Sequence, residues 1–161
     1  ILDMSKIEAG AVKLNLRKFE IDTCKKEVIN IINPLLLQKK QTLKTELNNF
    51  EIKADYNKIQ QILFNLLSNA IKYTPDNGEI NINCYKEQTN AIIKIKDNGI
   101  GIESKYLNRI FNKFEQIGEP QQNSTGLGLA ITKELINIHN GKISVKSEPN
   151  KGTIFIVRIP L

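Results

Sequence analysis

Two asparagines lie four residues apart in the segment KIQQILFNLLSNAIKYT, where Asn65 and Asn69 are followed by Lys72 and Tyr73. On a helix this three- and four-residue spacing gathers the four side chains on one face, opposite the leucines of the same segment. Stacked amide oxygens suit a hard cation such as Mg²⁺, which takes only one or two protein oxygens and completes its shell with water and phosphate. A solvated helix face would more often carry Glu, Lys and Arg, but it explains the same residues, so the spacing alone leaves both interpretations open.

A carboxylate stands at the end of the apolar run in AIIKIKDNGIGI. Strand alternation places Ile93, Ile95 and Asp97 on one face, so the carboxylate ends a buried row and needs a hydrogen-bond partner. The exocyclic amine of adenine is a suitable donor, and such a charge-assisted bond contributes about 1.5 to 3 kcal/mol. Gly99 and Gly101 would then let the backbone approach a flat ring. Taken alone, an Asp-Asn-Gly triplet is more typical of a hairpin turn.

Glycines recur in a third segment, NSTGLGLAITKEL, where Gly126 and Gly128 precede the apolar face of a predicted helix. Free backbone amides and the positive end of a helix dipole bind phosphate, and glycines leave room for it. A plain glycine-rich helix start is the alternative. The segment matches neither the GxxxxGK[ST] phosphate loop nor a dinucleotide fingerprint, which disfavours both of those folds.

The segment between the two glycine motifs, LNRIFNKFEQIGEPQQNST, predicts an amphipathic helix followed by a polar loop. Arg109 and Lys113 could then reach toward phosphate while the loop acts as a mobile lid. A surface helix and loop explain the segment equally well. The apolar face of the expected helix consists of Leu107, Ile110, Phe111 and Phe114.

The composition predicts a globular scaffold for these motifs. A chain of 161 residues that is 40% hydrophobic fits one domain. Cys24 and Cys84 lack metal-ligand or CxxC spacing, so they are expected to be reduced, which favours the cytosol. The most apolar stretch, 28–37, is interrupted by polar residues and proline, so no membrane span is expected. The net charge of +6 (23 − 17) suits an anionic partner, but the basic residues are spread along the chain and nucleic-acid binding is not expected.

Hydrophobic periodicity predicts strands and helices in a mixed order. The chain is expected to open on the end of a helix that stops at Gly10. A later helix should be capped by Asp22 or Thr23 and kinked at Pro34, and the single histidine, His139, should cap another helix or lie on the surface. Adjacent strand pairs and segregated helices predict a two-layer α/β sandwich, a mixed sheet with helices on one face. The expected strands are 14–21, 43–47, one near 52, 79–86, 91–96, 142–147 and 153–160, and the expected helices are 22–40, 55–74, one around 107–114 and one from 126 to 141.

Four motifs in this order decide between the open interpretations. The segments NLLSNAIKYT, DNGIGI, IFNKFEQ and GLGLAI resemble the N box, first glycine box, F box and second glycine box of histidine kinases. These kinases share an ATPase superfamily with gyrase, Hsp90 and MutL (GHKL), so the resemblance implies the Bergerat-type ATP-binding fold. It covers the chain from about Leu14, and the opening ILDMSKIEAG is similar to the end of the second helix of the kinase dimerisation and phosphotransfer domain. The expected domains are therefore 1–12, the end of that helix, and 13–161, the catalytic domain.

The resemblance implies ATP and Mg²⁺ as ligands. Asn69 would coordinate the metal with Asn65 nearby, Lys72 would contact phosphate, and these three are the expected catalytic residues. Tyr73 would stack on adenine and Asp97 would accept a hydrogen bond from it. Phe111 and Phe114 are also expected at the nucleotide, where they would anchor the lid. The other residues expected there are Gly99, Gly101, Ile102, Lys113, Thr125, Gly126, Leu127, Gly128 and Leu129, preceded by Ser124 where many relatives carry another glycine.

Asn65 distinguishes a kinase from a hydrolase. Hydrolysing relatives carry a glutamate at this position as the general base for water, and an amide cannot accept that proton. Phosphoryl transfer needs mainly positioning and charge stabilisation. The resemblance thus implies the catalytic domain of a two-component sensor histidine kinase, whose acceptor histidine lies upstream of the segment resembling SKIEAG. The alternatives are a nucleotide-sensing module without phosphotransfer and a hydrolase of the gyrase or Hsp90 type.

The expected partners follow from the same resemblance. They are the phosphotransfer and dimerisation domain of the parent protein and a response-regulator receiver domain. Dimers of these kinases form through helices mostly missing here, so this chain is expected to be a monomer and its parent a homodimer. The domain is expected to be cytoplasmic and not to contact a membrane, even where the parent is membrane-anchored.

Overall fold

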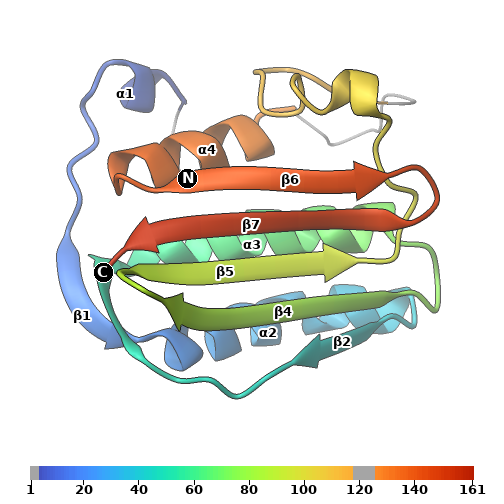
Figure 1. The fold of residues 1–161 in the computed structure, drawn as a ribbon, viewed down its shortest axis with the longest axis horizontal. Helices are drawn as coiled ribbons and strands as arrows, with labels where there is room; N and C mark the ends of the chain where they lie inside the picture. The colour runs from blue at the N-terminus through green and yellow to red at the C-terminus, as the bar shows by residue number, and fades with distance from the viewer. Residues whose placement is uncertain (1–3, 118–125) are drawn as a thin grey trace.

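The computed structural model describes residues 4–117 and 126–161 (Figure 1). Their elements are α1 (Met4–Glu8), β1 (Leu16–Glu20), α2 (Ile21–Gln38), β2 (Thr42–Thr45), β3 (Glu51–Asp55), α3 (Tyr56–Tyr73), β4 (Glu79–Glu87), β5 (Asn90–Asp97), the 3₁₀ turn η1 (Ser104–Tyr106), α4 (Gly128–Ile138), β6 (Lys142–Glu148) and β7 (Gly152–Pro160). The large sheet has the strand order β2-β4-β5-β7-β6, in which β2 and β4 are parallel and the other neighbours are antiparallel. β1 and β3 form a small antiparallel sheet.

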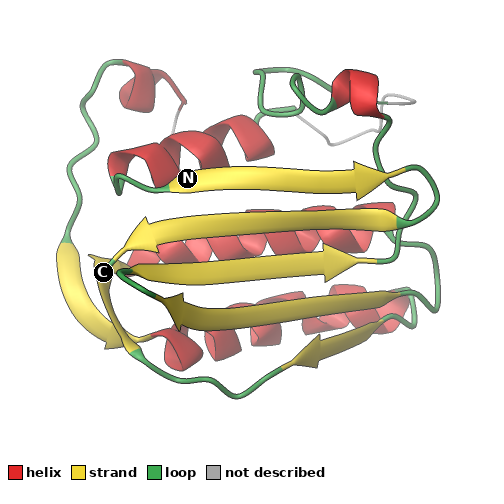
Figure 2. Cartoon of the chain, viewed as in Figure 1, coloured by secondary structure: helices red, strands yellow, loops and turns green. Residues whose placement is uncertain are grey.

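The long helices cover one face of the large sheet. Figure 2 shows α2 and α3 lying behind the strands, and α3 packs against both α2 and α4. The architecture confirms the predicted two-layer α/β sandwich with a mixed sheet. No helix in the described ranges is long and apolar enough to cross a membrane.

Alternation along the strands explains why the helices cover a single face. On β4, Ile80, Ile82 and Cys84 are buried, while the residues between them are partly exposed. The antiparallel register sets Ile82 opposite Ile95 and Cys84 opposite Ile93, so the buried rows continue across the sheet. Each large aliphatic side chain buried here contributes about 1.5 to 3 kcal/mol. On α3 the fully buried side chains are Ile59, Ile62, Leu63, Leu66 and Leu67, and they fix which face of α3 remains polar.

The start of α3 is fixed by its cap and by the single histidine. Asp55 is the N-cap, and its side chain accepts hydrogen bonds from the backbone N–H groups of Lys58, at 3.2 Å, and Asn15, at 2.9 Å. The Asp55 N–H donates to Nε2 of His139 at 3.2 Å, and Nδ1 of the same ring lies 2.7 Å from the Leu135 carbonyl. His139 is therefore the C-cap of α4, as one of the two expectations held, and it also connects α4 to the start of α3. The alternative expectation of a surface position is wrong, because the side chain is buried.

The start of α2 differs from the sequence prediction. Since α2 begins at Ile21, the predicted caps Asp22 and Thr23 both lie inside the helix. Asp22 is buried in the first turn, where it forms an ion pair with Lys25 at 2.8 Å. The helix continues through Pro34 as a single element.

The segment predicted as a helix around 107–114 consists of tight turns, and the 3₁₀ turn η1 ends just before it at Tyr106. The Arg109 N–H donates to the Tyr106 carbonyl at 2.8 Å. This bond joins residues three apart, as in a 3₁₀ turn, whereas an α-helix joins residues four apart. Ile110 is buried as expected, but Phe114 has a φ of 61° and is 72% exposed. Phe114 N–H donates to the Gly126 carbonyl at 3.0 Å, so a contact distant in sequence shapes this segment.

Candidate functional site

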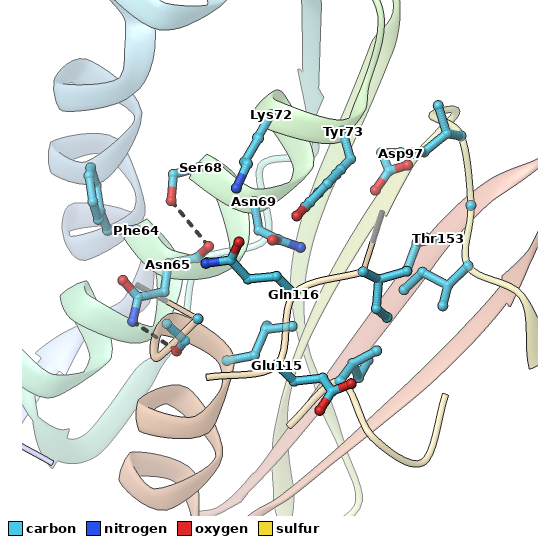
Figure 3. Close-up of a pocket in the computed structure, with 18 residues that line it drawn as sticks. Phe64, Asn65, Ser68, Asn69, Lys72, Tyr73, Asp97, Glu115, Gln116 and Thr153 are labelled. Carbon is cyan, nitrogen blue, oxygen red and sulfur yellow. Dashed lines mark hydrogen bonds between the residues drawn. The ribbon is translucent and has the colours of Figure 1, made fainter. Parts of the chain in front are cut away.

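A cavity of about 720 Å³ opens between α3, the end of β5 and the start of α4 (Figure 3). The predicted residues that line it are Asn65, Asn69, Lys72, Tyr73, Asp97, Gly101, Ile102, Gly126, Gly128 and Leu129. Thus the first three motifs of chemical interest meet at one place. Five other predicted residues are described but are not among the lining residues, namely Gly99, Phe111, Lys113, Phe114 and Leu127, and Thr125 lies outside the described residues.

The polar face of α3 forms one wall of the cavity. Asn65 Nδ2 donates to Thr132 Oγ1 at 3.1 Å and to the Gly128 carbonyl at 3.4 Å, which ties α3 to the first turn of α4. Figure 3 shows Asn69 and Lys72 directed toward the cavity from the next turns of α3. The Lys72 Nζ also lies 5.1 Å from the centroid of the Tyr73 ring. The predicted helical face is therefore present, and it carries one cation and two amides.

Asp97 lies at the opposite end of the cavity, where β5 ends. Its side chain is buried, and the Gly99 N–H donates to its Oδ1 at 2.9 Å. Burial raises the pKa of the Asp97 carboxyl, while hydrogen bonds from the backbone of Gly99 and Thr153 act in the opposite direction. The carboxyl group also lines the cavity, so a donor on a ligand in the cavity could reach it.

The glycines of the DNGIGI motif are required by the protein's own packing. A Cβ on Gly99 would lie 2.4 Å from the Tyr73 carbonyl oxygen. Gly101 has a φ of 70°, and a Cβ there would lie 1.9 Å from the carbonyl oxygen of Glu148. Both glycines therefore have a scaffold role, because they let the loop pack against α3 and β6. Gly101 also lines the cavity, and close approach of a ring there stays a prediction. At Gly128, in contrast, a Cβ would meet no atom within 4 Å, so the start of α4 is open.

The two basic residues expected to reach phosphate have carboxylate partners instead. Lys113 forms an ion pair with Glu8 of α1, and Arg109 forms one with Glu115. Lys113 is not among the cavity-lining residues. In this conformation Lys72 is the basic side chain that the cavity presents among the described residues.

The two aromatic residues expected to anchor a lid differ from each other. Phe111 packs edge-on against Phe155 of β7, with ring centroids 6.3 Å apart and an interplanar angle of 75°. Phe111 therefore anchors its segment to the sheet. Phe114 is largely exposed and makes no such contact among the described residues, so the structure does not support an anchoring role for it.

Several lining residues were not predicted. Phe64 and Ser68 extend the face of Lys72 at four-residue spacing, so the helical periodicity already contained the signal for them. Thr153 could not be found locally, because it meets Asp97 only through the pairing of β5 with β7. The remaining unpredicted lining residues are Ile100, Ile110, Glu115, Gln116 and Ile117.

One protein-family model matches two thirds of the chain. It describes histidine kinase-, DNA gyrase B- and HSP90-like ATPases, and it matches residues 54–161, which include both walls of the cavity. The chain belongs to this family. It is an ATP-binding catalytic domain of the histidine-kinase type, as the four motifs together predict.

Two curated relatives named as histidine kinases match almost the whole chain. The circadian input-output histidine kinase CikA of Synechococcus elongatus is 37% identical over 167 residues, covering 99% of this chain and 22% of that protein. The sensor histidine kinase RcsC of Escherichia coli is 40% identical over 171 residues, covering 100% of this chain and 18% of that protein. The chain thus spans only about a fifth of the length of these relatives.

Solved structures share the fold. Full-length ShkA in complex with AMPPNP superposes with a TM-score of 0.86 at 26% identity, covering 97% of this chain and 33% of that one. The histidine kinase ThkA in complex with the response regulator protein TrrA gives a TM-score of 0.78 at 25% identity, covering 97% of this chain and 45% of that one.

Proposed function

We propose that this domain binds Mg²⁺-ATP in the cavity and donates the γ-phosphoryl group to a histidine on a helix outside the chain. The observation that carries the proposal is the placement of Asn69 and Lys72 on one wall of the cavity and Asp97 at its other end. In this reaction the acceptor nitrogen forms a bond to phosphorus as the bond to the bridging oxygen of ADP breaks. The domain contributes position and charge.

The two ends of the cavity would bind different parts of the nucleotide, adenine at one end and the phosphates at the other. Asp97 would accept a hydrogen bond from the exocyclic amine of adenine, and Tyr73 would contact the ring. The phosphates would lie toward Lys72 and the start of α4, where Gly128 leaves the backbone open and the helix dipole is positive. Asn65, which ties α3 to α4, would keep these two phosphate-binding elements in register.

The donor set suits a magnesium ion that arrives with the nucleotide. Among the described residues no cluster of three or more His, Cys, Asp or Glu side chains could hold a metal. An amide oxygen of Asn69, with Asn65 nearby, fits Mg²⁺ whose other ligands are phosphate oxygens and water. The ion would neutralise phosphate charge during transfer.

Transfer to a protein is favoured over hydrolysis by the chemistry of Asn65. An amide cannot take a proton from water, so the residue cannot replace a general base. Release of phosphate by this chain alone would favour the hydrolase alternative, and ATP binding without labelling of a histidine-bearing helix would favour a sensing module.

The setting of the domain is proposed from its relatives. Residues 1–12, with α1 at Met4–Glu8, would end the phosphotransfer helix, and 13–161 would form the catalytic domain. The parent protein would be a homodimer, and this chain alone a monomer. The complex of ThkA with the response regulator protein TrrA supports a response-regulator receiver domain as a second partner. The free, buried Cys24 and Cys84 support a cytoplasmic location.

A labelling experiment tests the transfer. The purified chain is mixed with [γ-³²P]ATP, Mg²⁺ and the phosphotransfer segment of its own parent protein. We expect acid-labile, base-stable label on the segment, lost with Asp97→Asn and retained with Asp76→Asn, which changes an exposed aspartate outside the cavity lining. Absence of label with wild-type protein that binds ATP would refute the proposed transfer.

A further inference from the structure

The carboxyl end of α3 carries Lys72 and Tyr73, and its carbonyl groups need partners from outside the helix. A helix leaves its last four carbonyls without intrahelical bonds. The carbonyl of Tyr73 accepts a hydrogen bond from the Ile100 N–H at 3.2 Å. The carbonyls of Ile71 and Lys72 still require donors, and no glycine cap follows the helix to supply them.

Lys39, at the C-cap of α2, supplies these donors. Its Nζ donates to the carbonyl oxygens of Ile71 at 2.7 Å, Lys72 at 3.3 Å and Thr74 at 2.6 Å. An ammonium has three donors, so this lysine is fully used at a single helix end. Gln41 Nε2 reinforces it by donating to Ile71 at 3.0 Å and Thr74 at 2.7 Å. A cation here also interacts favourably with the negative end of the helix dipole.

The same helix end supports the adenine side of the cavity. The Tyr73 carbonyl contacts both residues that follow the DN of the DNGIGI motif, since Ile100 donates to it and Gly99 packs against it. Gly99 in turn donates its N–H to Asp97. A shift of the end of α3 would therefore move Tyr73 directly and move Asp97 through the Gly99–Ile100 backbone.

We infer that Lys39 is a positioning residue for nucleotide binding: it holds the end of α3 so that Tyr73 and Asp97 keep their places around adenine. Lys39 is not among the cavity-lining residues, so it acts without touching the ligand. The inference rests on the proposed function, because it assigns this cavity end to adenine.

Two neighbouring lysines give a matched comparison. Lys39→Met removes the ammonium and keeps the length of the side chain. Lys40→Met removes the same charge at the next residue, which is exposed and whose side chain makes no hydrogen bond or ion pair in the described structure. Any loss of long-range electrostatic attraction for ATP is therefore the same in both variants. By calorimetry we expect Lys39→Met to raise the Kd of ATP and of adenosine by the same factor, about tenfold, and Lys40→Met to change either by less than about twofold.

A spectroscopic readout separates positioning from simple stabilisation. In ¹⁵N–¹H spectra of the nucleotide-free chain, Lys39→Met should shift the amide signals of Gly99 and Ile100, and Lys39→Arg should restore both the shifts and the affinity. If Lys39→Met lowers Tm but leaves the two amide signals and both Kd values unchanged at a temperature where the variant is folded, Lys39 is only a helix cap and the inference is overturned. Should Lys39→Met not fold, Lys39→Gln, whose side chain is shorter and uncharged but keeps an amide donor, should shift the same two amide signals and raise both Kd values by a smaller factor.

The two proposals fail in different ways. Wild-type chain that binds neither ATP nor adenosine would refute the proposed function, while the amide shifts would still report whether Lys39 is coupled to Gly99 and Ile100. Wild-type binding with an unaffected Lys39→Met variant would refute only the inference.

Discussion

Asp97 shows how a single residue can favour ligand binding while it lowers the stability of the nucleotide-free domain. Because burial raises its pKa, its charged form is held at a cost in the folded chain that the unfolded chain does not have. The N–H groups of Gly99 and Thr153 recover only part of that cost. A donor from adenine would recover more, so the stability of the free domain and the affinity for ATP should respond to this residue in opposite directions.

Replacing Asp97 with asparagine tests whether stability of the free domain and affinity for ATP change in opposite directions. At neutral pH, Asp97→Asn should raise the Tm of the nucleotide-free domain, since the amide has no charge to desolvate and still accepts from Gly99. The same change should weaken ATP binding by about tenfold to a hundredfold, the loss expected for one charge-assisted hydrogen bond. Thermal melts and calorimetry measure the two effects. A variant with lower Tm and unchanged affinity would contradict both.

The pH dependence has a defined sign. The folded domain holds the Asp97 proton more tightly than the unfolded chain, so this residue's contribution to the free energy of unfolding becomes more favourable as pH falls through the raised pKa. ATP affinity should move the other way, because the protonated carboxyl is a poorer acceptor. Affinity should therefore begin to fall at a pH above the ordinary aspartate value of 3.8. A titration series should show this step in wild-type protein and not in Asp97→Asn.

At the scale of the element, α3 was predictable because its signals are local. The N-cap at Asp55, the apolar period and the TPDNG turn all lie in the sequence itself, and the helix spans Tyr56–Tyr73 against a prediction of 55–74. The helix predicted around 107–114 does not form, because the hydrogen bond from Phe114 to Gly126 and the packing of Phe111 on Phe155 depend on residues distant in sequence.

The residues of the candidate site likewise fall into two groups, those predictable from local sequence and those that are not. Asn65, Asn69 and Lys72 follow from spacing on one helix. Thr153 reaches the cavity through strand pairing, and Lys39 supports it through α2, so neither leaves a local signal. Spacing could place side chains on a face, but it could not tell which distant carbonyls and strands would complete the site.

The cap of α3 gives a prediction at this scale. Asp55→Ala removes the acceptor for the Lys58 and Asn15 N–H groups, so it should lower the free energy of unfolding by about 1 to 2 kcal/mol in urea titrations. Lys58 and Asn15 donate to different oxygens of Asp55, so Asp55→Asn keeps one acceptor of the two and should recover part of the loss. Equal losses in the two variants would show that the charge of Asp55, and not its capping geometry, stabilises the helix.

At the scale of the whole molecule, the cavity joins parts of the chain that are far apart in sequence. Its walls come from α3, the end of β5, the start of α4 and β7, and the helices that carry them bury their other faces in one core. A ligand that contacts all of these elements can bind only when they are assembled. Its binding energy should therefore stabilise the fold as a unit.

Mg²⁺-ATP at about 100 times its Kd should add about 2.7 kcal/mol to the free energy of unfolding and raise Tm by about 5 to 10 °C. GTP supplies the same phosphates but presents a carbonyl oxygen where adenine has its amine, and that oxygen would face the Asp97 carboxylate without a hydrogen bond between them. The shift in Tm with GTP should therefore be much smaller at the same concentration, which differential scanning fluorimetry can measure. Equal shifts with the two nucleotides would mean that phosphate contacts alone hold the ligand, and Asp97 would then have no part in reading the base.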